Sequence, residues 1–143
     1  MNVATVLQHK GGNVVTARPD SSIAEICNLL RSARIGAVII SPDRVRVEGI
    51  VSERDIVRAL AEHGAAALSK TAADLMTRGV ITCAPDEDVA GLMTVMTTGR
   101  FRHVPVCDEG VLVGIVSIGD VVRVRVEEIE HEAEALRTYV TQG

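Results

Sequence analysis

A duplicated phrase constrains this chain more than any other feature of its sequence. Residues 49–60 read GIVSERDIVRAL and residues 114–125 read GIVSIGDVVRVR, with seven of the twelve positions identical. Upstream, residues 14–40 align with residues 80–106 at an offset of 66, and both stretches contain a Thr followed by a Pro-Asp pair. A period near 66 residues is longer than most solenoid repeats. We therefore expect two pseudo-symmetric units within the 143 residues.

Each copy predicts the same order of elements. A short β-rich run, VVTA or VITC, precedes a Pro-Asp pair and a helix whose apolar residues recur at helical spacing. Two more β-rich runs, joined by a turn, lead into a second helix that begins at the repeated Ser. The unit is therefore β-α-β-β-α, and the fold class is α/β (α+β). We expect the first unit with its lead-in segment over residues 1–67, the second over 68–125, and a C-terminal helical extension over 126–143.

Composition narrows the possible functions. The net charge of −4, the pI near 5.5 and the presence of only two aromatic residues argue against a nucleic-acid-binding protein. No run approaches the roughly 18 apolar residues of a membrane span, and the first residues do not resemble a signal peptide. Three widely spaced cysteines without a Cys-x-x-Cys pair indicate reduced thiols and no metal site. We expect a cytoplasmic protein.

An apolar stripe follows the end of the second copy. Its members are spaced 4, 3, 4, 3 and 4 residues apart, which is a heptad pattern on one long acidic helix. Such a stripe either packs back onto its own domain or contacts a second subunit, and we expect a homodimer. The stripe consists of Val122, Val126, Ile129, Ala133, Leu136 and Val140.

The repeated Ser-x-x-Asp motif, Ser52 with Asp55 and Ser117 with Asp120, has two interpretations. The Ser can accept a backbone N–H as a helix N-cap, and the Asp can return a bond to the Ser N–H, although Glu or Gln is the usual residue there. Alternatively, the helix N-terminus offers free N–H groups to an anion. A carboxylate one turn into the helix then accepts hydrogen bonds from the vicinal hydroxyls of a ribose.

Together with the duplication, these motifs resemble a tandem pair of CBS domains, the family named after cystathionine β-synthase. Each unit ends with the same motif, in which a Gly and two apolar residues precede Ser-x-x-Asp. Residues 72–77 (AADLMT) resemble the segment that leads into each domain of that family. The resemblance spans about residues 3–125, and small stand-alone bacterial CBS-pair proteins are the most similar group. It implies two units packed sheet to sheet, with two clefts for AMP, ADP, ATP, NAD(H) or S-adenosylmethionine.

The resemblance also implies roles for single residues in each cleft. The Asp of each motif holds ribose and the Ser lies near the ribose or phosphate, while the first strand of the opposite copy lines the adenine. One cleft then contains Asp120 and Ser117 with Thr16 and Ala17, and the other contains Asp55 and Ser52 with Thr82 and Cys83.

The two clefts differ in basic residues. Copy two has Arg100, Arg102 and His103 where copy one has Arg34, Gly36 and Ala37. The resemblance implies that residues at the Arg102 and His103 positions contact phosphate, which a guanidinium can grip in bidentate fashion. The alternative is that the arginines are solvated surface charges and that His103 is an ordinary core or surface histidine. Gly36 and Ala37 leave room for a bulkier ligand or an empty site.

Arg54, next to Asp55, adds either a phosphate contact in the first cleft or a solvent-facing charge on its helix.

Three functions remain in competition. The sequence favours a non-catalytic adenine-nucleotide sensor that signals through its conformation or oligomeric state to an unidentified downstream protein. An enzyme is disfavoured, because the sequence has no P-loop, no recognisable nucleophile set and no cluster of metal-binding carboxylates. The third possibility is a structural or interaction module in which the motif serves folding and capping alone.

Overall fold

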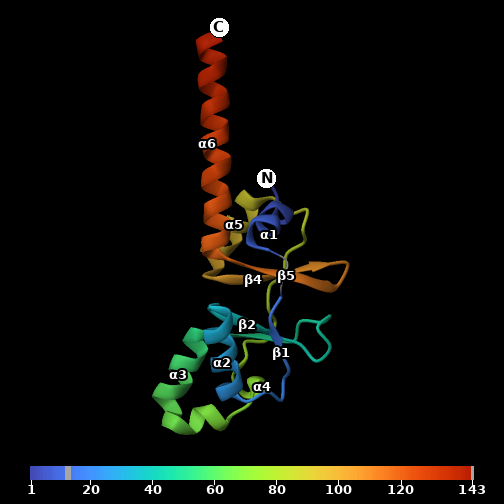
Figure 1. Ribbon diagram of the computed structural model, residues 1–143, viewed down its shortest axis with the longest axis vertical. Helices are drawn as coiled ribbons and strands as arrows, with labels where there is room; N and C mark the ends of the chain where they lie inside the picture. The colour runs from blue at the N-terminus through green and yellow to red at the C-terminus, as the bar shows by residue number, and fades with distance from the viewer. Residues whose placement is uncertain (12–13, 143) are drawn as a thin grey trace.

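The structure is a computed structural model that describes residues 1–11 and 14–142, and it contains two stacked units with one long helix projecting from the second (Figure 1). The first unit holds a three-stranded sheet of order β1-β2-β3, in which β1 is parallel to β2 and β2 is antiparallel to β3. Its elements are β1 (Thr16–Ala17), α2 (Ile23–Ala33), β2 (Ala37–Ile40), β3 (Gly49–Ser52), α3 (Glu53–His63), the 3-10 helix η1 (Gly64–Ser69) and α4 (Ala72–Leu75).

The second unit is built on an antiparallel hairpin of β4 and β5, with a bulge between Val106 and Cys107. Its apolar core contains residues from α5, β4, β5 and α6, and also from the N-terminal helix α1. Among the described residues, no helix combines the length and apolar character needed to cross a membrane. The elements are α1 (Val3–Lys10), α5 (Val89–Gly99), β4 (His103–Asp108), β5 (Val111–Ser117) and α6 (Ile118–Gln142).

Two predicted strands are shorter than the sequence indicates. The β-rich run before Gly49 forms a turn instead, because the Asp43 carboxylate accepts the N–H groups of Val45 and Arg46 and withdraws them from strand pairing. The same backbone donors, Arg46 first, lower the pKa of Asp43 to about 2. The VITC run of copy two is reduced to a single parallel bridge between Cys83 and Val106.

The lead-in helices are exchanged between the two units. Helix α1 precedes copy one, yet its Val3 and Val6 are buried in the core of the second unit, and the Val3 N–H donates to the carbonyl of Glu87. Helix α4 precedes copy two, yet Ala72 and Met76 lie in the core of the first unit. Residues 1–67 were expected to form one unit with their lead-in segment. In space, that segment completes the other unit.

The exchange explains why each copy keeps a glycine before its Ser-x-x-Asp motif. A Cβ atom on Gly49 would lie 2.7 Å from the sulfur of Met76 and 2.9 Å from the carbonyl oxygen of Thr77. A Cβ atom on Gly114 would lie 2.6 Å from a methyl carbon of Leu7. Each glycine thus leaves space for the lead-in segment that precedes the other copy in the sequence.

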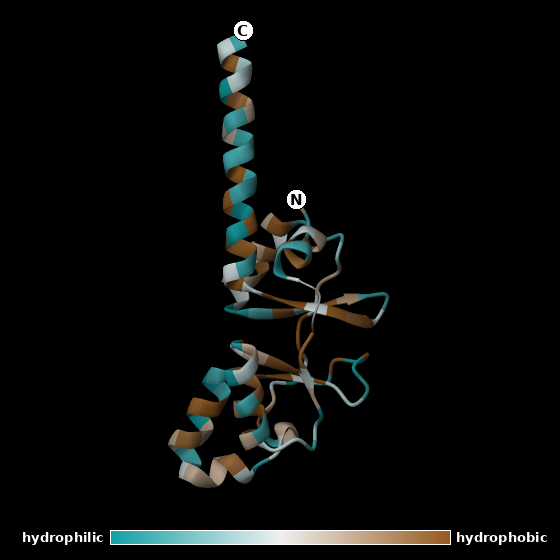
Figure 2. Cartoon of the chain, in the orientation of Figure 1, coloured by the Kyte–Doolittle hydropathy of each residue, from teal (hydrophilic) through white to brown (hydrophobic). Residues whose placement is uncertain are grey.

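The two sheets face each other across a thin apolar layer, with α2, α3 and α4 beyond one sheet and α1, α5 and α6 beyond the other (Figures 1 and 2). Ile39, Ile50 and Leu112 are its buried members, and Cys107 and Ile115 pack against them. The predicted α/β fold of two units packed sheet to sheet, with a long C-terminal helix, is therefore confirmed.

Replacing Gly49 with Ala should destabilise the protein by about 1–3 kcal/mol, the usual cost of overpacking a core. The added methyl would strike a backbone carbonyl as well as Met76. Gly91→Ala is the matched control, because open space surrounds that helical position and Ala is favoured over Gly there by up to about 1 kcal/mol. Urea unfolding of the two variants measures both effects, and equal stability of Gly49→Ala and wild type would contradict the packing role of the glycine.

Candidate functional site

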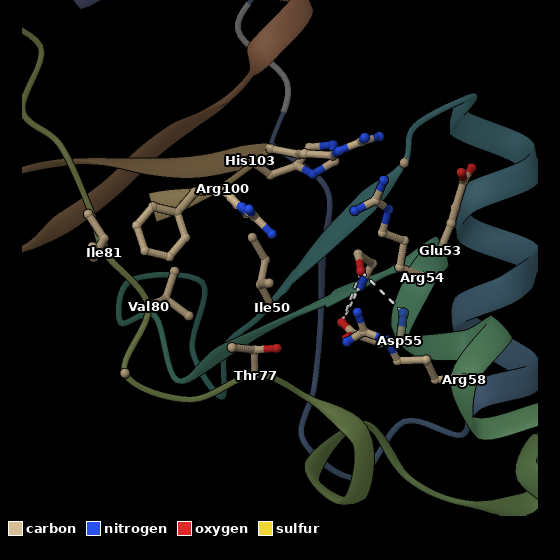
Figure 3. Close-up of a pocket in the computed structure, with 15 residues that line it drawn as sticks. Ile50, Glu53, Arg54, Asp55, Arg58, Thr77, Val80, Ile81, Arg100 and His103 are labelled. Atoms are coloured by element: carbon tan, nitrogen blue, oxygen red, sulfur yellow. Dashed lines mark hydrogen bonds between the residues drawn. The ribbon is translucent and has the colours of Figure 1, made fainter. Parts of the chain in front are cut away.

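A pocket of about 310 Å³ lies between the two units (Figure 3). This volume is within the range of small-molecule sites. The first unit contributes the end of β3 and the first turns of α3. The second contributes the segment before β4, and the chain between α4 and copy two closes one side. The lining residues are Gly36, Ile50, Ser52, Glu53, Arg54, Asp55, Arg58, Thr77, Gly79, Val80, Ile81, Arg100, Phe101, Arg102 and His103.

The Ser-x-x-Asp motif of copy one forms a complete capping box at the start of α3. The N–H of Asp55 donates to Ser52 Oγ at 3.3 Å, and the N–H of Ser52 donates to Asp55 Oδ2 at 2.9 Å. Ser117 and Asp120 make the equivalent pair of bonds at the start of α6. Asp therefore performs the reciprocal role in both copies, and capping is a real function of the motif.

Capping leaves part of the Asp55 carboxylate available. Ser52 donates both its N–H and its hydroxyl to the same oxygen, Oδ2, at 2.9 and 3.0 Å. Within the described part of the chain, the second oxygen, Oδ1, accepts no hydrogen bond. The side chain lines the pocket, so this oxygen can accept hydrogen bonds from a ligand.

The pocket concentrates positive charge. Arg54 and Arg58 lie one helical turn apart on α3, whereas Arg100 and Arg102 come from the second unit. The side chains of Arg54 and Arg100 extend into the space between the units (Figure 3). Four guanidinium groups face two carboxylates in this lining, although the whole chain has a net charge of −4. An anion bound here would be held from both units.

The opposite side of the pocket is apolar. Ile50 lies on β3, Val80 and Ile81 follow α4, and Phe101 precedes β4. A flat, weakly polar ring system suits such a surface, because burial of apolar area on both partners stabilises the contact.

His103 lies next to Gly36, where an added methyl group would make only an ordinary van der Waals contact with the imidazole. A Cβ atom on Gly36 would lie 3.4 Å from Nε2 of the imidazole. Burial lowers the pKa of His103, the positive charges of Lys10 and Arg102 lower it further, and the carboxylates of Asp120 and Glu53 partly offset them. The lowered pKa of His103 favours the neutral imidazole, in which one ring nitrogen accepts a hydrogen bond and the other donates one.

The structure brings together half of the residues singled out from the sequence. The pocket contains Ser52, Arg54, Asp55, Arg100, Arg102 and His103. The three basic residues of copy two were grouped with Asp120, but they line the pocket of Asp55. The reason is the sheet-to-sheet packing, which turns the start of β4 toward α3 of the other unit.

The other six candidates lie outside this pocket. Ala17 is buried in the core of the first unit and Cys83 in that of the second, where burial raises the pKa of the thiol to about 12. Thr16 pairs with Ile39 in the sheet, and Thr82 is exposed. Ser117 and Asp120 form the capping box of α6.

Sequence reasoning missed several lining residues. Val80 and Ile81, rather than Thr82 and Cys83, form the wall contributed by this stretch. Arg58 was detectable, since it follows Arg54 by four positions and such residues share one face of a helix. Glu53, Thr77 and Gly79 carried no signal of their own.

The chain belongs to the CBS-domain family, because the CBS domain matches residues 6–62 and again residues 72–127. Among named relatives, the mitochondrial CBS domain-containing protein CBSX3 of Arabidopsis thaliana is 32% identical over 149 residues, covering 99% of this chain and 72% of the relative.

Solved structures show the same architecture. The CBS-domain-containing protein ATU1752 from Agrobacterium tumefaciens is 46% identical with a TM-score of 0.83, covering 87% of this chain and 99% of that one. The CBS domain pair of MJ0100, in complex with 5′-methylthioadenosine and S-adenosyl-L-methionine, is 30% identical with a TM-score of 0.78 over 90% and 98%. The AMP complex of PAE2072 from Pyrobaculum aerophilum is 28% identical with a TM-score of 0.75 over 84% and 89%.

Proposed function

We propose that this protein is a non-catalytic regulatory module that binds an adenine nucleotide of the AMP, ATP or NAD(H) class in the pocket of Asp55. One observation carries the proposal: a carboxylate oxygen of Asp55 that accepts no hydrogen bond from the described residues shares a pocket with four guanidinium groups from both units. Structural neighbours that bind AMP, or methylthioadenosine with S-adenosylmethionine, support the adenosine class.

The ribose is assigned to Asp55 and the adenine to the apolar wall. Vicinal hydroxyls donate to the free Oδ1 of Asp55, in the way that acidic residues hold ribose in dinucleotide-binding folds. The adenine ring then packs among Ile50, Val80 and Ile81, which line the same pocket.

The phosphate is assigned to the arginines, with Arg102 and Arg100 on one side and Arg54 on the other. Charge-assisted bonds of this kind are about twice as strong as neutral ones. They favour a phosphate over the positively charged sulfonium of S-adenosylmethionine. Because the cations belong to different units, a bound nucleotide changes the free energy of one arrangement of the units relative to others, which is the requirement for signalling.

Capping supports the competing interpretation of a structural or interaction module. Both Ser-x-x-Asp motifs satisfy helix N-termini, so folding alone accounts for their presence.

The structure describes no metal-binding cluster: among the described residues, no group of three or more His, Cys, Asp or Glu side chains is arranged to hold a metal ion. The two interpretations predict different effects of substitutions at Asp55.

Replacing Asp55 with Asn should weaken AMP binding at least tenfold, or about 1.4 kcal/mol. The change keeps the size of the side chain but removes its charge and converts one acceptor into a donor. Wild-type protein should bind 2′-deoxy-AMP more weakly than AMP to a similar extent, because the deoxy sugar lacks the 2′-hydroxyl that donates to Asp55. Isothermal titration calorimetry with both nucleotides measures these losses.

Asp74→Asn is the matched control. Asp74 closes a capping box with Thr71 at the start of α4, accepting the Thr71 N–H at 3.0 Å, and it does not line the 310 Å³ pocket between the two units. Both variants should lose similar stability, up to the roughly 0.5–2 kcal/mol of a lost cap, but only Asp55→Asn should lose affinity. If Asp55→Asn bound AMP and deoxy-AMP like the wild type, the structural interpretation would stand instead.

Replacing Arg102 with Ala should weaken AMP much more than adenosine, because adenosine has no phosphate to lose. A hydrogen bond to a charged group contributes about 1.5–3 kcal/mol, which corresponds to roughly tenfold to more than a hundredfold in affinity. Arg31→Ala removes the same charge from α2, outside the pocket lining, and should leave both affinities unchanged. Equal weakening of AMP and adenosine in Arg102→Ala would assign Arg102 a structural role.

We further propose that the protein is a homodimer joined through α6. This 25-residue helix packs against α5 and α1 near its start, and its C-terminal part extends beyond the rest of the described chain (Figure 1). The heptad stripe remains exposed there, with Ile129 at 47%, Leu136 at 63% and Val140 at 68%. A second copy presents the identical stripe at the identical spacing, which is the condition for a two-stranded coiled coil.

Replacing Ile129 and Leu136 together with Lys should convert the dimer to a smaller species in sedimentation velocity, since two charges would enter the apolar seam. The double variant His131→Lys with Thr138→Lys is its control. Those residues have the same spacing of seven, and both are exposed on α6. A sedimentation coefficient unchanged by the Ile129 and Leu136 substitutions would contradict the proposed interface.

A further inference from the structure

The carboxylates of the two Ser-x-x-Asp motifs, Asp55 and Asp120, have different hydrogen-bond partners. Asp55 Oδ2 accepts hydrogen bonds only from Ser52 within the described residues. Asp120 Oδ2 accepts the N–H of Ser117 at 2.9 Å and, in addition, the ammonium of Lys10 at 2.9 Å. The Asp120 carboxylate therefore already holds a cation that belongs to the protein itself.

Lys10 replaces a backbone contact that copy one makes differently. By the offset of 66 residues, Lys10 aligns with Met76. After Met76, the N–H of Thr77 donates to the carbonyl oxygen of Ile50 at 2.9 Å. The equivalent carbonyl of copy two, that of Ile115, accepts instead from the Lys10 ammonium at 2.9 Å. The lysine side chain thus bridges β5 and Asp120, where copy one has an apolar side chain and a backbone bond.

The ion pair is partly sheltered from water. The side chain of Asp120 is 18% exposed and that of Lys10 is 28% exposed. Burial raises the pKa of Asp120, but the bonds from Ser117 and Lys10 outweigh burial and lower it overall. The carboxylate is ionised and its charge is matched. Asp120 Oδ1 accepts no hydrogen bond from the described residues, as is also true of Asp55 Oδ1, but the ammonium on Oδ2 neutralises the Asp120 carboxylate, whereas no ion pair among those residues involves Asp55. A ribose hydroxyl would therefore gain a weaker bond from Asp120 than from Asp55.

We infer that Lys10 is a specificity-determining residue that confines nucleotide binding to the pocket of Asp55, so that each chain takes one adenine nucleotide. The inference rests on the proposed function, because it specifies which of the two clefts performs it.

The first test is stoichiometry, measured by isothermal titration calorimetry with AMP. Wild-type protein should bind one AMP per chain, and Asp120→Asn should bind one AMP with an affinity within about twofold of the wild type. Two AMP molecules per wild-type chain, or a marked loss of affinity or stoichiometry in Asp120→Asn, would overturn the inference and leave the proposed function intact. Absence of AMP binding to the wild type would overturn both.

The second test is a gain of binding. Lys10→Met gives copy two the residue that copy one has at the aligned position, and it is introduced into the Asp55→Asn protein, whose own pocket is weakened. The double variant should bind AMP at least tenfold more tightly than Asp55→Asn alone. Adding Asp120→Asn should abolish that gain, which assigns it to the second cleft. Lys10→Gln is a second, independent variant for the same test, because it also removes the positive charge that pairs with Asp120.

Thermal melting without ligand verifies that each variant is folded, and the variants built in the Asp55→Asn protein are compared with Asp55→Asn itself, which has already lost part of its cap. If folded Lys10→Met and Lys10→Gln proteins both bind AMP no better than Asp55→Asn, Lys10 does not confine the nucleotide and the inference is wrong.

Discussion

The close approach of each lead-in segment to the strand before the Ser-x-x-Asp motif of the opposite copy is the contact on which the rest of the structure depends. Gly49 makes the first approach possible, because a larger residue there would meet the backbone carbonyl of Thr77 as well as Met76, and a larger residue at Gly114 would displace the end of the Leu7 side chain. The cores of both units are completed by residues from in front of the other copy. Neither unit can leave its partner without exposing its own core, and this holds the pocket between them in place.

The packing of the two units determines which side chains line the pocket. Each Ser-x-x-Asp motif first satisfies a helix N-terminus, and only a carboxylate oxygen left over from capping remains for a ligand. The two units also contribute unequal side chains at aligned positions. Gly36 of copy one lines the pocket together with Arg102 and His103 of copy two, while Ala37 is buried in β2. The basic residues of copy two therefore line the pocket that contains Asp55 of copy one.

The duplication was sufficient to predict the unit and its order of elements, and the resemblance to CBS pairs implied the stacking of two copies. It was insufficient for assigning side chains to clefts. Arg102 and His103 were assigned to the cleft of Asp120 because they share its copy, whereas the cleft they line depends on how the sheets face each other. Cys83 and Ala17 are buried in the cores instead of lining a cleft. Successive residues of a strand point to opposite faces, so an error of one residue reverses the predicted side. The Lys10 contact joins positions 110 residues apart, and nothing local in the sequence indicates it.

The determination of a crystal structure with AMP bound tests the central claim most directly. The account predicts one nucleotide per chain between the units, with both ribose hydroxyls on Asp55, the adenine beside Ile50 and Val80, and the phosphate on Arg100 and Arg102. Lys10 should remain paired with Asp120. A nucleotide whose ribose contacts Asp120, or one bound with its phosphate away from the arginines, would contradict it.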